Sequence, residues 1–173
     1  MRITLPLILL CLTARRAAES AAGLHWAMPV GWHSEGARPM RAATYTVPAA
    51  PGDHDNAECG VYFFGAGQGG GIEANIERWK GQFHTADGKL AVARIAKRTV
   101  HDLAVTTIDT SGQYSGMGGP MGGGPEKPGY RLLGAIVEGP GGHIFLKFTG
   151  PAKTIAANQP KFEQMLASFQ KEK

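Results

Sequence analysis

Apolar and polar residues alternate most clearly between Tyr130 and Pro151. The two-residue period predicts two strands, 131–138 and 143–149, and the glycine- and proline-rich residues 139–142 between them predict a tight reversal. Alternation along the second strand gives one apolar face, with Ile144, Leu146 and Phe148, and one mixed face, with His143, Phe145, Lys147 and Thr149. A hairpin alone is not stable in water, so we expect it to form the centre of a larger sheet.

The same alternation predicts further strands on the N-terminal side of this hairpin. We expect the stretch 58–64 to be an interior strand, because Cys59, Val61 and Phe63 would form one apolar face. Basic residues interrupt the stretch 92–100, which is typical of an edge strand. The other predicted strands are 24–29, 40–47 and 103–110, the last one reversing from 92–100 at His101-Asp102.

Two segments have the periodicity of helices. Ile72, Ile76, Trp79 and Phe83 form one apolar stripe and predict a helix over 72–83. A second helix is predicted from 151 to 170, with an interruption at Pro160, because proline removes a backbone donor and clashes with the preceding turn. The stretch 113–129 is rich in glycine, methionine and proline, and we expect it to be a loop.

These elements indicate an α+β fold. About six to seven strands follow one another through short reversals, and only two segments are helical, so we expect a mostly antiparallel sheet with helices packed on it.

The N-terminus has the features of an export signal. A basic start precedes the apolar run 3–12, and the small residues up to Ala22 fit a signal peptidase site. Residues 1–22 are therefore predicted to be a signal peptide and 23–173 a single domain, periplasmic or secreted, with no membrane span after cleavage. Arg15 and Arg16 lie between the apolar run and the cut, so an uncleaved N-terminal anchor is the alternative.

The net charge bears on nucleic-acid binding, and the cysteine count bears on disulfide formation. The formal net charge is +4, and part of this excess lies in the predicted leader, so the remaining surface is nearly balanced and favours no nucleic-acid partner. Cleavage would leave Cys59 as the one cysteine, which excludes an internal disulfide.

Both ends of the predicted domain resemble the PsbP/Mog1-like proteins. The residues that carry this resemblance are 26–32 (WAMPVGW), 145–151 (FLKFTGP) and 162–169 (FEQMLASF). The resemblance implies an antiparallel sheet sandwiched by helices and a binding or accessory character. It identifies no functional residue, since these motifs concern packing and members of one fold differ in function.

The segment Gly65–Gly70 matches the G-x-G-x-x-G pattern of dinucleotide-binding loops. Glu73 and Glu77 follow where phosphates would bind, and Asp87 lies in a turn rather than at the end of a second parallel strand. We therefore interpret the segment as a flexible connector between a strand and a helix.

Metal ligands and thiol chemistry have two candidate segments. Asp53, His54, Asp55, Glu58 and Cys59 lie within seven residues, but their spacing matches no tetrahedral site, and strand alternation places Glu58 and Cys59 on opposite faces. A thiol enzyme with His54 as the base for Cys59 is one alternative. A periplasmic copper or zinc protein is another, in which Met117 and Met121 bind the metal with His101 or His143.

A third possibility is a binding patch of aromatic residues. Tyr45, Tyr62, Tyr130 and Phe145, with Arg131 and Lys147, could line a groove on the less-covered sheet face, unless the second helix covers them. We expect a non-catalytic binding or accessory module without a cofactor, which contacts an envelope protein or a small ligand through this sheet face or through the loop 116–129.

Overall fold

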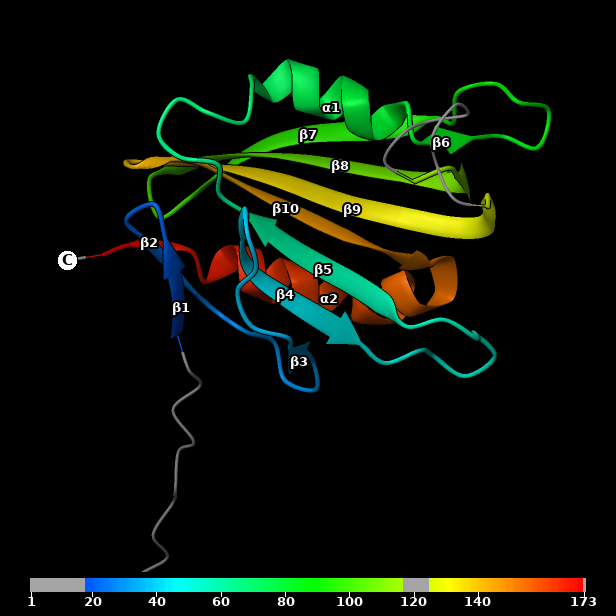
Figure 1. Ribbon diagram of the computed structural model, residues 1–173, viewed down its shortest axis with the longest axis horizontal. Coiled ribbons are helices and arrows are strands. Elements are labelled where there is room, and N and C mark those ends of the chain that lie inside the picture. Colours follow the sequence, from blue (N-terminus) through cyan, green and yellow to red (C-terminus); the bar gives the residue numbers. More distant parts are fainter. Residues whose placement is uncertain (1–17, 117–124, 173) are drawn as a thin grey trace, which may run out of the picture.

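The computed structural model describes residues 18–116 and 125–172. Within them, eight strands form one antiparallel sheet in the order β3-β4-β5-β10-β9-β8-β6, and β7 also pairs with β8 (Figure 1). The strands are β3 (His33–Ser34), β4 (Arg41–Val47), β5 (Ala57–Tyr62), β6 (Phe83–His84), β7 (Ala93–Val100), β8 (Leu103–Tyr114), β9 (Lys127–Gly139) and β10 (Gly142–Pro151). With two helices, α1 (Ile72–Lys80) and α2 (Ala152–Ala167), this confirms the predicted α+β class.

The hairpin of β9 and β10 forms the middle of the sheet, as predicted. Its register runs from Gly139 opposite Gly142 to Tyr130 opposite Pro151. β8 and β9 extend further than expected, because Tyr114 still pairs with Lys127 beyond a bulge after Gly112. The predicted loop 113–129 therefore begins and ends inside strands. Backbone pairing needs no apolar side chain, so composition did not reveal these strand ends.

α2 packs against the sheet face that carries Ile144, Leu146 and Phe148. The helix contributes Ile155, Phe162, Met165 and Leu166 to this main core. The predicted interruption at Pro160 is wrong, because α2 continues through this residue. Pro160 lies on the exposed side of the helix, where its ring meets no other element and its missing donor removes only one intrahelical bond.

A separate three-stranded sheet closes the main core at the two ends of the chain. It consists of β1 (Ala18–Ala21), β2 (Leu24–Ala27) and β11 (Gln170–Lys171), in the order β1-β2-β11. Trp26 stacks on Phe169 with ring centroids 5.2 Å apart and donates a hydrogen bond of 2.8 Å from Nε1 to Tyr45 Oη. The predicted strand 24–29 was expected in the main sheet, but its strand residues, Leu24–Ala27, belong to this smaller one.

α1 packs on the opposite face of the main sheet through Ile76 and Trp79. Gly134 on β9 makes the close approach possible, since a Cβ atom there would lie 2.7 Å from Trp79 Cζ3 and from Ile108 Cγ2. The helix ends at Lys80, and Phe83, expected in its last turn, instead lies in β6 and is fully buried. The second core therefore lies between one short helix and β8, β9 and β10 (Figure 1).

The N-terminal boundary bears on the predicted leader. Residues 1–17 lie outside the described part of the chain, whereas 18–21 form β1. The carbonyl of Ala22 accepts a hydrogen bond of 3.0 Å from the Gly141 amide in the β9–β10 turn. A cut after Ala22 would remove β1, and the signal peptide stays a prediction. Among the described residues, no helix is long and apolar enough to cross a membrane.

Candidate functional site

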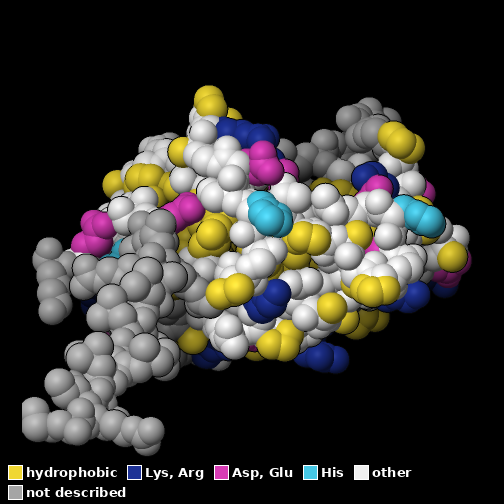
Figure 2. All heavy atoms as spheres, turned by 90° about the horizontal axis from the view of Figure 1, so that it is seen from below, with side chains coloured by type: hydrophobic (Ala, Val, Ile, Leu, Met, Phe, Trp, Pro, Cys, Tyr) yellow, Lys and Arg dark blue, Asp and Glu magenta, His cyan; other side chains and the backbone are white. Residues whose placement is uncertain are grey.

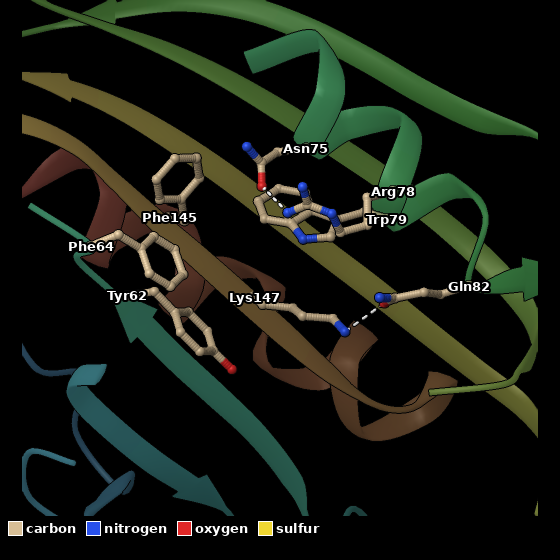
Figure 3. Close-up of a pocket in the computed structure, with 8 residues that line it drawn as sticks. All are labelled: Tyr62, Phe64, Asn75, Arg78, Trp79, Gln82, Phe145 and Lys147. Atoms are coloured by element: carbon tan, nitrogen blue, oxygen red, sulfur yellow. Dashed lines mark hydrogen bonds between the residues drawn. The ribbon is translucent and has the colours of Figure 1, made fainter. Parts of the chain in front are cut away.

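α1 leaves part of its sheet face uncovered, and the side chains beside it form the candidate site. Figure 3 shows Asn75, Arg78 and Trp79 of α1 on one side, the aromatic rings at the end of β5 on the other, and Phe145 and Lys147 of β10 between them. Phe64 is 37% exposed, so the aromatic surface continues to solvent. We call this surface the Lys147 face, defined by Arg41, Tyr62, Phe64, Tyr114, Phe145 and Lys147.

Lys147 lies in a cross-strand row with glycine on both sides. Its register partners are Gly60 on β5 and Gly134 on β9. The Tyr62 ring lies against the backbone of Gly60, where a Cβ atom would be 2.7 Å from Tyr62 Cε2. Trp79 takes the corresponding place over Gly134. The absence of two side chains thus lets two aromatic rings lie low on the sheet on either side of the lysine.

The ammonium group of Lys147 binds neutral oxygen atoms. Its Nζ donates to Gln82 Oε1 at 2.6 Å and to Tyr114 Oη at 3.0 Å. Within the described residues Lys147 forms no salt bridge. Burial lowers the pKa of Lys147 to about 8, with nearby Arg41 adding to the decrease and Glu58 opposing it. A partly buried cation without a carboxylate partner is costly to the fold and is frequent at functional sites.

Two small hollows flank Lys147. The first has a volume of about 60 Å³ and lies between α1 and the rings of Tyr62, Phe64 and Phe145 (Figure 3). The second, about 90 Å³, is polar and is lined by Arg41, Glu58, Tyr62, Tyr114, Lys147 and Thr149. Sites that enclose a whole small molecule measure roughly 300–1,000 Å³. Each hollow therefore has room for a side chain or a small polar group.

The predicted aromatic patch is confirmed in part. Tyr62, Phe145 and Lys147 come together as expected, and Tyr130 lies close by, stacked on Tyr114 with ring centroids 5.8 Å apart. The placement of Tyr45 is wrong, since it is fully buried in the main core beneath α2.

Arg131 is also misplaced in that prediction. It lies on the α2 side, where its guanidinium forms an ion pair with Asp109 and a hydrogen bond of 2.9 Å to Gln159 Oε1. Strand alternation explains this position, because Arg131 follows Tyr130 by one residue and must point to the other face.

Sequence reasoning did not identify several residues of the site. Trp79 and Gln82 come from α1 and the residues after it, Tyr114 from the unrecognised end of β8, and Arg41 from β4. Arg41 reaches this face because the β4–β5 register shifts between Arg41 and Ala43. Its guanidinium lies 5.0 Å from the Tyr62 ring centroid and 2.8 Å from Glu58 Oε1. A bulge leaves no sequence signal that a two-residue period would detect.

The acidic segment at 53–55 has structural roles. Asp53 Oδ2 accepts hydrogen bonds from the Thr154 amide at 2.9 Å and from its hydroxyl at 2.6 Å, which satisfies a free donor at the start of α2. Asp55 Oδ2 accepts from Tyr130 Oη at 2.5 Å and from Lys127 Nζ at 3.2 Å, and these two bonds lower the pKa of Asp55. The open hollow of about 480 Å³ beside this segment is thus bordered by carboxylates that already have partners.

Cys59 is fully buried in the main core. Burial raises the pKa of its thiol well above the ordinary value. A nucleophilic cysteine needs an accessible thiolate, and His54 lies exposed on the loop before β5. The structure therefore gives no support to the thiol-enzyme alternative.

The metal alternative rests in part on residues that lie outside the described chain. Met117 and Met121 are among residues 117–124, which the structure does not describe. Within the described ranges, no group of three or more His, Cys, Asp or Glu side chains is placed to hold a metal ion. His101 Nδ1 lies 2.9 Å from the Phe169 carbonyl oxygen, and His143 packs edge-on against Phe145. A copper or zinc site stays a prediction.

The glycine motif 65–70 connects β5 to α1, as we interpreted it. The Asn75 side chain donates to the carbonyls of Gly69 and Gly71, both at 2.9 Å, and so holds the loop closed at the helix start. β5 and its neighbour β10 are antiparallel. The parallel strand–helix–strand unit that dinucleotide loops require is therefore not formed here.

Figure 2 shows a side of the molecule on which Lys and Arg side chains are interspersed with apolar and acidic groups. This side presents no continuous cationic surface. The expectation that the protein binds no nucleic acid rests on composition and stays a prediction.

Comparison with known proteins adds evidence on the fold alone. No family model and no curated protein matches this chain. The solution structure of cyanobacterial PsbP from Synechocystis sp. PCC 6803 is similar with a TM-score of 0.53 and 12% identity, covering 91% of each chain. A Pseudomonas aeruginosa protein of unknown function, PA94, has a TM-score of 0.47 and 13% identity over 88% of this chain and 94% of its own. The chain has a PsbP-like fold, which confirms the fold that the resemblance implied.

Proposed function

We propose that this protein is an exported, non-catalytic binding or accessory module that contacts another protein of the cell envelope through the Lys147 face. The observation that carries the proposal is Lys147 itself, a largely buried ammonium between aromatic rings with no salt bridge in the described chain. Glu58 lines the same hollow as Lys147 but is paired with Arg41, so Lys147 has no carboxylate partner of its own in the described chain. A partner that brings an acceptor would recover part of the desolvation cost of Lys147.

The size and composition of the hollows favour a protein partner. Hollows of about 60 and 90 Å³ accept single side chains from an opposing surface. Exposed aromatic rings beside arginine are typical of the residues that contribute most to protein interfaces. Tyr62 and Phe64 supply the rings, and Arg41 and Arg78 lie at the margins.

Export and accessory character belong to the same proposal. The apolar run near the N-terminus supports export, and the PsbP-like fold supports a helix–sheet–helix sandwich that acts by binding. We also propose that the protein is not an enzyme.

The test is affinity capture of the protein from its own envelope extract, followed by identification and direct binding of the captured protein. The variant Tyr62→Ala with Lys147→Gln should weaken binding of that protein at least tenfold. Lys97→Gln, an exposed charge change on β7, is the matched control and should leave binding unchanged.

A third variant without residues 117–124 tests the glycine-rich loop that was the other expected contact. If only this deletion abolishes binding, the contact lies in the loop and the proposal for the Lys147 face fails. Full binding by the double variant Tyr62→Ala with Lys147→Gln would also rule out the Lys147 face as the contact.

A further inference from the structure

The polar hollow between Arg41 and Lys147 contains more hydrogen-bond donors than acceptors. Arg41 is already paired with Glu58, at 2.8 Å, and lies over the Tyr62 ring. Lys147 has three N–H donors, of which two reach Gln82 and Tyr114. The third donor has no recorded acceptor among the described residues.

Thr149 adds a second donor on the same side of the hollow. Its Oγ1 is buried and, within residues 18–116 and 125–172, makes no hydrogen bond. Thr149 lies two residues after Lys147 on β10, so both side chains point to the same face of the sheet. Buried hydroxyl groups without a partner are rare, and each one calls for a specific explanation.

We propose that this hollow is a subsite for one carboxylate group, which accepts hydrogen bonds from Lys147 Nζ and Thr149 Oγ1. This inference rests on the proposed function and names the chemistry that the Lys147 face recognises. The two oxygen atoms of a carboxylate match the two donors in number, and a charge-assisted bond to ammonium is among the stronger hydrogen bonds.

The surrounding charges favour a carboxylate over other ions. Arg41 and Lys147 outnumber Glu58 by one charge in this hollow, so one carboxylate brings it to neutrality. A doubly charged phosphate would exceed this balance, and the two cations would repel a metal ion. The volume of about 90 Å³ fits a carboxylate with one or two methylene groups. This chemistry is found both in acidic side chains of a partner protein and in free small carboxylates.

Binding should also depend on the protonation of Lys147. Its pKa of about 8 means that much of the ammonium is lost near pH 9, while a bound carboxylate would favour the charged form. Affinity for a carboxylate is therefore expected to fall several-fold between pH 7 and pH 9. A merely structural lysine would not produce this pH profile.

The experiment is a two-dimensional amide NMR titration of the protein at constant ionic strength and pH 7. One arm uses sodium acetate with sodium chloride as the reference. The other arm uses an acetylated, amidated hexapeptide with one glutamate between leucines, with the glutamine peptide as the reference. Saturable shifts at Gly60, Lys147 and Thr149 are expected with the carboxylate probes alone.

Variants assign the effect to the two donors. Lys147→Gln should weaken carboxylate binding at least tenfold, and Thr149→Val, which removes the unpaired hydroxyl while keeping the shape, should weaken it a few-fold without loss of folding. Lys97→Gln is the matched control and should bind as the unaltered protein does.

Each outcome decides the inference. Binding of acetate and peptide alike supports a subsite open to free carboxylates, and binding of the glutamate peptide alone supports a side chain of a partner. Non-saturable shifts in both arms, or equal binding by Lys147→Gln, overturn the subsite. If Lys147→Gln still captures the envelope partner while Tyr62→Ala does not, the subsite fails and the proposed function stands.

Discussion

The Nζ atom of Lys147 lies 3.0 Å from the hydroxyl oxygen of Tyr114, although the two residues come from non-adjacent strands, β10 and β8. β9 separates these strands. Trp79 fills the space over Gly134, the β9 residue in the row of Lys147, and Tyr114 lies further along β8, beyond the bulge after Gly112. The lysine therefore reaches past Trp79 to an oxygen acceptor two strands away. This position buries most of the lysine, and burial lowers its pKa.

The free energy of unfolding should rise with pH above neutrality. The pKa of Lys147 is lowered to about 8 from 10.5, so the protonated form destabilises the folded state fully below pH 8. This penalty disappears as pH rises from about 8 towards 10.5, where the unfolded chain still binds the proton. Each pKa unit corresponds to about 1.4 kcal/mol, and partial exposure reduces the effect, so we expect a gain of roughly 1–2 kcal/mol between pH 8 and pH 10.

Urea unfolding at several pH values measures this gain, with Lys147→Met as the comparison. Methionine removes the charge and keeps the length, so the variant should be more stable at pH 7, and its advantage should shrink as pH rises. Burial raises the pKa values of Tyr62 and Tyr114 above their ordinary value of 10.0, so in both folded proteins these phenols stay mostly protonated up to pH 10. Parallel pH profiles for the two proteins would contradict the prediction.

Gly134→Ala should destabilise the protein by about 1–3 kcal/mol, because a new Cβ atom 2.7 Å from Trp79 forces α1 away from the sheet. Gly81→Ala is the matched control. Gly81 has ordinary helical dihedral angles and only van der Waals neighbours, so its free energy of unfolding should change by about 0.5 kcal/mol or less. Chemical denaturation measures the free energy of unfolding of both variants. A change for Gly134→Ala as small as that for Gly81→Ala would mean that Trp79 repacks without cost and would contradict the prediction.

A chain that begins at Gly23 should be less stable than one that begins at Ala18. The shorter chain lacks β1, which pairs with β2 over four residues, and the Ala22 carbonyl that accepts from Gly141. At about 1 kcal/mol for a net hydrogen bond, we expect a loss of roughly 1–3 kcal/mol. Thermal unfolding of the two chains measures this loss, and N-terminal sequencing of the protein isolated from its own cells shows whether a cut occurs and where. Equal stability would make the predicted cut after Ala22 compatible with the fold.

Cys59 should resist alkylation in the native state and react fully in urea. The chain that begins at Ala18 has no Cys11, so mass spectrometry after iodoacetamide treatment reports on Cys59 alone. The thiol is buried among core residues beneath α2, and burial raises its pKa, so little thiolate is available to react. Rapid modification of the folded protein would restore the thiol-enzyme alternative.

The centre of the fold was predictable because its side chains alternate without interruption. β10 has one face fully buried, so a shift of one residue would expose Ile144, Leu146 and Phe148, and the register follows from the pattern. The reversal at His101-Asp102 was also evident, and both residues adopt the positive φ angles of a tight hairpin turn. Local patterns therefore predicted the longer strands and the two hairpins among them.

The candidate site was less predictable, because it combines four strands and a helix terminus. Alternation identified Tyr62, Phe145 and Lys147 as neighbours on one face. It does not indicate which residues of the helix and of the other strands pack beside them. Arg41 needed a bulge, and Tyr114 needed pairing within a stretch whose composition indicates a loop. Tyr45 was misplaced because its burial beneath α2 depends on packing between distant segments. Arg131 was misplaced although alternation with Tyr130 already assigns it to the other face of the sheet.

The small sheet constrains the order in which the chain can fold. β2 lies between β1, at the start of the described chain, and β11, at its end. Trp26 stacks on Phe169, which is synthesised long after it. The main core therefore stays open on this side until the segment around Phe169 has been made, and a chain shortened before that segment would lack the residues that close it.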